Sequence, residues 1–323
     1  MVLAFLCLLP STLISLTAPV SAQPHPVGSL EGAIDYDRVL EHVRYLSGLG
    51  SRVTGYPGSY SASRYISDVL KSYGLNVTVQ TYKVVVPIDE GATITLLSPQ
   101  RRTIKAHALW PNSVQTSPTP PEGVTGRLIY VGDGDLEDFD GKEVEGAIAL
   151  MDFNSGDNWI NAAKLGAKAV IFIEPPHTTY LQCMKKFLDT PVHFPRLYVT
   201  EADGLLLREA SGNEVRVVSR MRYAEVTAEN VIGIVNGTHP QDAIIVSSHY
   251  DSWSVVPALS TGANEAVSIA YLLELARYIK EQQPLRSVWF VAFSGHWQGL
   301  EGPRNFVEEF FFDPAVQEDE VRI

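Results

Sequence analysis

The sequence predicts an α/β protein in which one sheet domain, with a mostly parallel or mixed sheet, is interrupted by a second α/β unit. Three observations support this fold class. Two helical patterns and a strand pattern fill residues 23–88, the pattern changes near residues 89 and 222, and a strand–helix–strand succession follows in residues 223–323. A chain of 323 residues can bury one large core or two medium ones.

The first segment begins with apolar residues at helical spacing over residues 35–47, followed by Gly48-Leu49-Gly50 as a stop signal. A second amphipathic helix fits Ser59 to Tyr73 and is followed by Gly74. Residues 76–86 alternate and are rich in Val, Thr and Tyr, which predicts a strand ended by Pro87.

The middle block, residues 89–222, reads as an α/β unit of its own. Its predicted strands are Thr93–Leu97, Leu128–Val131, Ala147–Asp152, Ala169–Ile173 and Glu214–Arg220, and its predicted helices are Trp159–Leu165 and Glu201–Ala210.

The third block contains a strand over Val231–Val235 and then a strand–helix–strand unit over residues 243–293, which predicts a right-handed βαβ unit. The long helix of this unit, residues 266–280, has an apolar face whose turns are marked by Val267, Ala270, Tyr271, Leu273, Glu274, Arg277 and Tyr278. A last helix is expected over Pro303–Phe311. Polar residues follow both strands of the unit, at the edge where open α/β sheets place their ligands.

Composition narrows the possible partners. A formal net charge of −12 disfavours nucleic acid and anionic membrane surfaces. The first 22 residues carry no charged side chain and end in Val20-Ser21-Ala22, which predicts a secretory signal peptide over residues 1–22 and a secreted protein. The alternative is a membrane anchor formed by an uncleaved N-terminal segment; no later run has the ~18 apolar residues of a membrane span. Removal of the leader with Cys7 leaves Cys183 as a single thiol, which we expect to be buried.

His249 and Asp251 lie two residues apart at the end of a predicted strand. This spacing places both side chains on one side, so that the carboxylate can orient the imidazole, as around a metal-binding histidine. The alternative is an inert histidine at a strand end. Gly262-Ala263-Asn264-Glu265, which opens the next helix, favours the metal-site interpretation.

These residues, together with Phe290–Phe293 and Gln298-Gly299-Leu300, resemble the co-catalytic di-zinc aminopeptidase superfamily, which includes aminopeptidase Y, glutamate carboxypeptidase II and the transferrin receptor. Residues 45–55 are similar to the segment that opens its catalytic domain. Residues 89–222 resemble its protease-associated domain. The resemblance implies a three-layer zinc-peptidase-like sheet domain in two segments, 23–88 and 223–323, with the protease-associated domain inserted between them.

The resemblance also implies roles for single residues. His249 matches a histidine that binds the first metal ion and Asp251 its orienting partner, and Glu265 stands where an aspartate bridges two zinc ions. His296 and Trp297 stand where the family has two glutamates, a general base and a metal ligand. A tryptophan has no lone pair for a metal ion, and His296 is either a base, a ligand or a structural histidine.

This ligand set is smaller than the three or four protein ligands of a usual zinc site. Two zinc ions are expected from the family, but His249, Glu265 and His296 alone predict weak or absent binding. Val321-Arg322-Ile323 resembles the beginning of a further strand, so we expect the sheet domain to be incomplete at the C-terminus.

Three functions remain open. The first is a zinc aminopeptidase that hydrolyses N-terminal peptide bonds, impaired or inactive in this chain. The second is a non-catalytic protein that binds peptides or proteins in the same cleft or through the inserted domain. The third is a truncated fragment of a longer enzyme.

Overall fold

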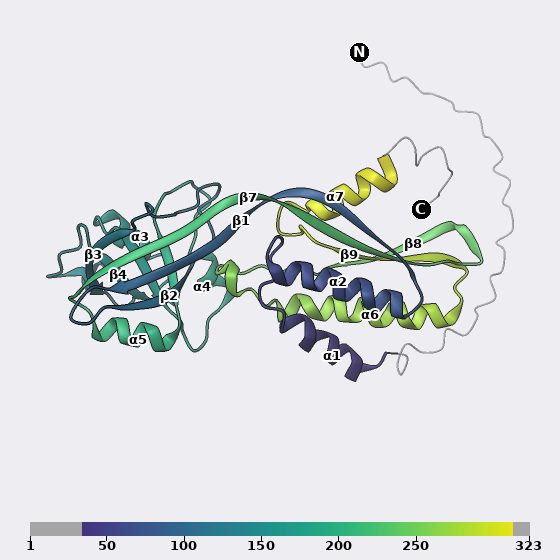
Figure 1. Ribbon diagram of the computed structural model, residues 1–323, viewed down its shortest axis with the longest axis horizontal. Coiled ribbons are helices and arrows are strands. Elements are labelled where there is room, and N and C mark those ends of the chain that lie inside the picture. Colours follow the sequence, from purple (N-terminus) through teal and green to yellow (C-terminus); the bar gives the residue numbers. More distant parts are fainter. Residues whose placement is uncertain (1–33, 313–323) are drawn as a thin grey trace, which may run out of the picture. The chain divides into compact units, whose positions relative to one another are not determined.

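The computed structural model describes residues 34–312, and those from Asp35 onward belong to one compact unit (Figure 1). Its helices are α1 (Tyr36–Ser47), α2 (Pro57–Ser72), α3 (Trp159–Lys164), α4 (Tyr180–Met184), α5 (Glu201–Glu209), α6 (Ala263–Gln282) and α7 (Glu301–Val307). Its strands are β1 (Asn76–Leu96), β2 (Arg102–Ala108), β3 (Val124–Tyr130), β4 (Ile148–Asp152), β5 (Ala169–Ile173), β6 (Arg196–Val199), β7 (Glu214–Val235), β8 (His239–His249) and β9 (Arg286–Phe293). The signal peptide predicted over residues 1–22 and the strand predicted at residues 321–323 lie outside the described residues.

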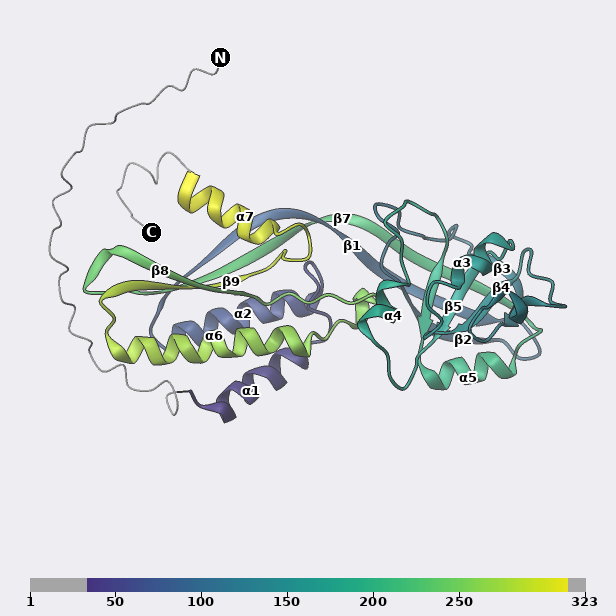
Figure 2. The same ribbon diagram turned by 180° about the vertical axis from the view of Figure 1, so that it is seen from behind.

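The sheet lobe, residues 35–88 and 223–312, contains a sheet in the order β1-β7-β9-β8. Helices α1, α2 and α6 lie on one side of this sheet and α7 on the other, as both views show (Figures 1 and 2). Alternation along β9 explains the two faces: Phe290 and Ala292 belong to the core under α2 and α6, whereas Val291 and Phe293 pack with Phe306 of α7. The predicted three-layer arrangement is confirmed.

Strands β8 and β9 are parallel and are connected by α6, as predicted. His249 at the end of β8 is in register with Phe293 at the end of β9. The residues that follow the two strands, from Tyr250 and from Ser294, therefore leave the sheet at the same edge.

The barrel lobe, residues 89–222, is a closed ring of strands in the order β1-β2-β6-β5-β4-β3-β7, closed by the pairing of β7 with β1. Apolar side chains fill its interior, among them Ile94, Ile104, Leu128, Ile148 and Leu197. Closure leaves this ring without a free edge. The neighbouring positions on β4, such as Ala149 and Met151, face a second core outside the ring, which explains why this strand is apolar throughout.

Strands β1 and β7 run through both lobes, and this corrects three predictions. Pro87 does not end a strand: it lies within β1, opposite Tyr223. Residues 76–89 of β1 pair with β7 alone in this part of the chain, and a proline is tolerated where a strand has one partner. The strands predicted at residues 93–97 and 76–86 are one element, and so are those predicted at 214–220 and 231–235.

The predicted domain boundaries, near residues 89 and 222, lie inside these long strands. Ile88 is paired with Arg222, and the register of the pair shifts between Asp89 and Ala92. The two boundaries thus face each other across one ladder. Their use as domain limits stays a prediction.

The buried face of helix α6 matches the expected one only in part, at Ala270, Leu273 and Glu274. Val267 and Tyr271 are 38% and 42% exposed, while the buried positions are Ala266, Ile269, Ala270, Leu272, Leu273, Glu274 and Ala276. The last predicted helix, Pro303–Phe311, begins earlier, as α7, and continues as a π-helical turn over Glu308–Phe312. Sequence patterning also missed β2, β6 and the short helix α4.

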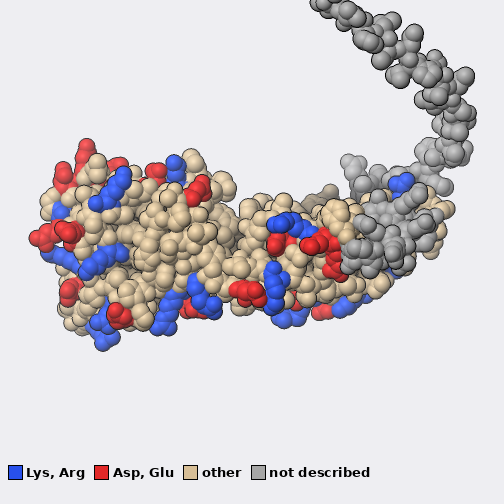
Figure 3. Space-filling view, turned by 90° about the horizontal axis from the view of Figure 1, so that it is seen from above, with Lys and Arg blue, Asp and Glu red and all other residues tan. Residues whose placement is uncertain are grey.

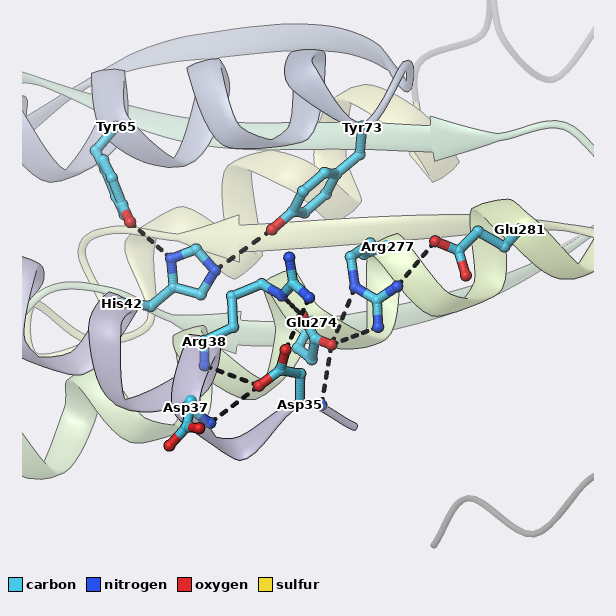
Figure 4. A network of polar contacts seen from close by, with 9 residues as sticks. All are labelled: Asp35, Asp37, Arg38, His42, Tyr65, Tyr73, Glu274, Arg277 and Glu281. Carbon is cyan, nitrogen blue, oxygen red and sulfur yellow. Dashed lines mark hydrogen bonds and ion pairs between the residues drawn. The ribbon is translucent and has the colours of Figure 1, made fainter. Parts of the chain in front are cut away.

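A network of polar contacts fastens α1 to α6 (Figure 4). Glu274 is fully buried and accepts hydrogen bonds from Arg277 and from the backbone N–H of Asp35, at 2.6 and 3.1 Å. Arg38 of α1 forms a second ion pair with it at 3.1 Å. Beside this network His42 lies between the hydroxyl groups of Tyr65 of α2 and of Tyr73, the residue that follows α2.

No helix in residues 34–312 is both long enough and apolar enough to cross a membrane. On the face shown in Figure 3, lysine and arginine side chains are interspersed with acidic ones.

Candidate functional site

His249 ends β8 with its imidazole partly exposed, and Asp251, two residues on, is fully buried. The imidazole Nδ1 lies 3.2 Å from Asp251 Oδ1 and 3.1 Å from the Asp251 carbonyl oxygen. Nδ1 is therefore the donor in the neutral ring, and Nε2 carries the free lone pair. Burial opposes protonation of this ring, but the hydrogen bond and charge of Asp251 outweigh it and raise the pKa of His249.

The second oxygen of Asp251 joins three segments of the chain. Asp251 Oδ2 accepts a hydrogen bond from the Thr54 hydroxyl and another from the backbone N–H of His296, both at 3.0 Å. The Thr54 hydroxyl in turn accepts from the backbone N–H of Gly295. All acceptor positions that face the protein are thus used, so Asp251 is a fixed orienting group for His249. Thr54 belongs to the segment that resembles the family's opening segment, yet its role was not predicted.

Arg52 fixes the turn before α6 and was also missed by the sequence interpretation. It is fully buried, and its guanidinium donates to four carbonyl oxygens, those of Leu46, Tyr250, Thr261 and Gly262. Burial lowers the pKa of Arg52, and the charges of Glu265 and Asp251 oppose this. Gly262 adopts φ +60°, and a Cβ there would lie 2.4 Å from Ser252 Cβ, so a glycine is required at this turn.

Glu265 lies in the first turn of α6 and lines a cavity of about 550 Å³ together with His249, His296 and Trp297. No residue between 34 and 312 forms a hydrogen bond or an ion pair with its carboxylate. The structure therefore brings three predicted site residues, His249, Glu265 and His296, to one cavity together with Trp297. The fourth, Asp251, is not among the lining residues but holds the His249 ring.

His296 and Trp297 follow β9. The His296 ring stacks on the His249 ring with centroids 4.0 Å apart and an angle of 8° between planes. Trp297 stands edge-on to both rings, with centroids at 5.9 and 5.2 Å. Burial and the charge of His249 lower the pKa of His296, and Asp251 opposes them.

This arrangement does not fit a zinc ion. In residues 34–312 no three His, Cys, Asp or Glu side chains lie together as a metal-binding group. The lone pair of an imidazole nitrogen lies in the ring plane, so the parallel rings of His249 and His296 direct theirs side by side rather than to one point. Trp297 offers no lone pair at all.

The cavity has an aromatic wall that the sequence interpretation missed. Trp253, two residues after Asp251, lines it together with Trp297 and with Tyr180 of α4. Cys183 of α4 is a free, half-buried thiol at the same cavity rather than the fully buried one expected, and burial raises its pKa. The proximity of Trp253 to Asp251 in the sequence was the available signal; nothing in the sequence linked Tyr180 to this site.

Comparisons with known proteins agree with both lobes. Residues 230–321 match Peptidase family M28, and residues 124–207 match the PA domain. The chain is 28% identical over 267 residues to aminopeptidase YwaD of Bacillus subtilis, covering 80% of this chain and 54% of the relative. It is 25% identical over 285 residues to carboxypeptidase Q of Bos taurus, covering 80% and 58%. It thus spans little more than half the length of these relatives.

Solved structures show the same fold. BSAP, a zinc aminopeptidase from Bacillus subtilis, aligns with a TM-score of 0.60 at 24% identity and covers 88% of this chain and 67% of its own. A peptidase M28 precursor from Shewanella amazonensis SB2B aligns with a TM-score of 0.56 at 20% identity and covers 87% and 69%. The family matches and the aminopeptidase relatives together show that the chain belongs to a zinc aminopeptidase-like superfamily, with residues 230–321 matching peptidase family M28 and residues 124–207 an inserted PA domain.

Proposed function

We propose that this chain is an exported M28-family protein that binds peptides in the cavity beside His249 and hydrolyses them weakly or not at all. The observation that carries the proposal is the stacking of His296 on His249 with Trp297 edge-on to both. His296 and Trp297 stand at the two positions where the family that the chain resembles has a general base and a metal ligand.

The binding part of the proposal rests on the preserved architecture around the cavity. Asp251 accepts a hydrogen bond from a backbone N–H that follows β9. Arg52 donates hydrogen bonds to backbone carbonyls that follow β8 and precede α6. Such a network holds the cavity walls in place whether or not a metal ion binds. Export is proposed from the leader predicted at residues 1–22.

A zinc aminopeptidase is the second candidate, and one observation favours it. The hydrogen bond from His249 Nδ1 to Asp251 leaves Nε2 available toward the cavity, which is the geometry of a zinc-binding histidine. In that case other parts of the whole protein would supply the further ligands.

Two assays on one preparation separate the candidates. Binding of a fluorescent hexapeptide is followed by anisotropy, and hydrolysis of a chromogenic amino-acid amide is followed with added zinc and with a chelator. We expect binding without chelator-sensitive hydrolysis. Hydrolysis that a chelator abolishes would establish the zinc peptidase instead, and absence of both would refute the proposal.

A matched pair of variants tests the location of binding. Val267 and Val307 are helix residues of the same 38% exposure, but only Val267 lines the cavity. We expect Val267→Trp to fill the cavity and lower peptide affinity at least about tenfold, because the bulk occupies the binding volume, and Val307→Trp to leave it unchanged. Equal affinities for the two variants would place the peptide elsewhere.

A further inference from the structure

The cavity beside His249 has a wall of three large aromatic side chains from separate segments: Tyr180 of α4, Trp253 after β8 and Trp297 after β9. The Trp253 ring lies in the middle of this wall. Its centroid is 6.5 Å from that of Tyr180 and 6.0 Å from that of Trp297. The rings of Tyr180 and Trp297 are tilted by 59° and 37° to that of Trp253, and all three lie near enough for one ligand group to contact more than one of them.

Trp253 is held from behind by further rings. Phe187 and Trp110 contact it edge-to-face, with centroids 6.0 and 5.8 Å away. Val255 and Val256, which follow it, are buried in the same core of the barrel lobe. The wall is therefore preformed, and a ligand that uses it loses little free energy in ordering it.

The cavity lining contains a carboxylate but no lysine or arginine. Glu265 is the one carboxylate among the lining residues. Arg52 lies behind the lining with its N–H groups directed at four backbone carbonyls, and the charge that His249 gains on protonation is matched by Asp251. The lining therefore combines the aromatic side chains and the imidazoles of His249 and His296 with one carboxylate that forms no ion pair within the described residues.

Aromatic side chains and a carboxylate in the lining of one cavity are the combination that recognises an organic cation through cation–π attraction and charge. We propose that the cavity binds the alkylated ammonium group of a ligand against Trp253 and Trp297, with Glu265 as the counter-charge. This inference rests on the proposed binding function and names the chemical class of the bound group. A primary ammonium requires three hydrogen-bond acceptors, whereas an alkylated one requires few, and Glu265 supplies the charge for either.

The test uses choline as the probe and 3,3-dimethyl-1-butanol, its uncharged isostere, as the matched control. Binding to the purified protein is measured by calorimetry and by quenching of tryptophan fluorescence, neither of which depends on activity. We expect choline to bind at least about tenfold more tightly than the isostere. Equal binding of the two would show a merely apolar cavity, and tighter binding of ethanolamine than of choline would show a primary-amine site; either result overturns the proposal.

Three variants assign the interaction to its residues. Glu265→Gln keeps the shape and removes the charge, and Trp297→Leu removes a π face from a side chain that is 39% exposed. Each is expected to weaken choline binding about tenfold. Tyr271→Leu, which changes an equally exposed ring of α6 outside the cavity lining, should have no effect. Unchanged affinity in Glu265→Gln and Trp297→Leu would contradict the inference.

The outcome is separable from that of the proposed function. If the hexapeptide binds but choline does not, the cation inference alone fails. If neither binds, both fail.

Discussion

Two of the three glutamates of helix α6, Glu265 and Glu274, lie nine residues apart in opposite surroundings. Glu274 is fully buried between Arg38 and Arg277 and has a backbone N–H as a further partner. Glu265 faces a cavity and has no partner among residues 34–312. A carboxylate paired with two arginines therefore joins two helices, whereas one that forms no ion pair or hydrogen bond within residues 34–312 is available to a ligand.

The largest effect should come from removing the enclosed glutamate. Glu274→Ala removes the buried acceptor shared by Arg38, Arg277 and the backbone N–H of Asp35, and leaves the two arginines only their exposed partners. We expect the free energy of unfolding to fall by about 3 kcal/mol. Urea denaturation measures it. Glu281→Ala is the control, because Glu281 forms an exposed pair with the same Arg277, and should change stability by less than about 0.5 kcal/mol. Similar losses of unfolding free energy in Glu274→Ala and Glu281→Ala would mean that Glu274 does not stabilise the packing of α1 against α6.

Lys186 provides a third case: its ammonium group is buried and forms no ion pair with an acidic side chain within residues 34–312. Lys186 of the barrel lobe is fully buried among the rings of Phe153 and Phe172 and donates to Ser155 Oγ, and burial lowers its pKa to about 8. The folded-state pKa is below the unfolded value of 10.5, so the cost of the charge is fully present below pH 8. It is relieved as the pH rises from about 8 to 10.5, where the unfolded chain binds more protons.

The expected result is an unfolding free energy that rises across this window by about 3 kcal/mol more in the wild-type protein than in Lys186→Met. Using the difference between the two proteins cancels the other groups that titrate there, such as Arg196. Parallel pH profiles for the two proteins would show that Lys186 keeps its proton in the fold.

Asp251 should rank next, because it resembles Glu274 in burial but lies under the cavity. Asp251→Ala removes the carboxylate acceptor of the Thr54 hydroxyl and the His296 N–H, and leaves His249 Nδ1 only the backbone oxygen of residue 251. We expect a loss of about 2 kcal/mol in urea denaturation. A loss below about 0.5 kcal/mol would mean that the three segments are held together by other contacts.

The smallest change in stability should come from Glu265. Because its carboxylate has no protein partner, Glu265→Gln should alter the free energy of unfolding by less than about 0.5 kcal/mol. The same variant is expected to lose choline binding, so its effect appears in affinity and not in stability. A destabilisation comparable to that of Glu274→Ala would remove the contrast on which the comparison stands.

Much of the fold was predictable because it depends on local periodicity. The strand Ala169–Ile173 was placed without error, and the βαβ unit that brings His249 and His296 together follows from the spacing of two apolar runs and a helix. The full length of strand β1 was not predicted, because a proline such as Pro87 locally indicates the end of a strand. The strand continues because it pairs with β7, whose residues lie more than a hundred positions later in the sequence.

The candidate site was predictable only where its residues follow the ends of those strands. His249, Asp251, His296 and Trp297 belong to that class. Arg52 and Tyr180 reach the site through tertiary packing, and Glu274 was read as a marker of an apolar face because periodicity records position and not charge. Partners that are distant in sequence decide what such side chains do.

The central claim is that the cavity beside His249 is a binding site without zinc. The most direct measurement is the zinc content of the purified protein after equilibration with excess zinc and gel filtration. The account predicts far less than one zinc ion per chain, unchanged in His249→Ala. One or two zinc ions per chain, lost in His249→Ala, would contradict it.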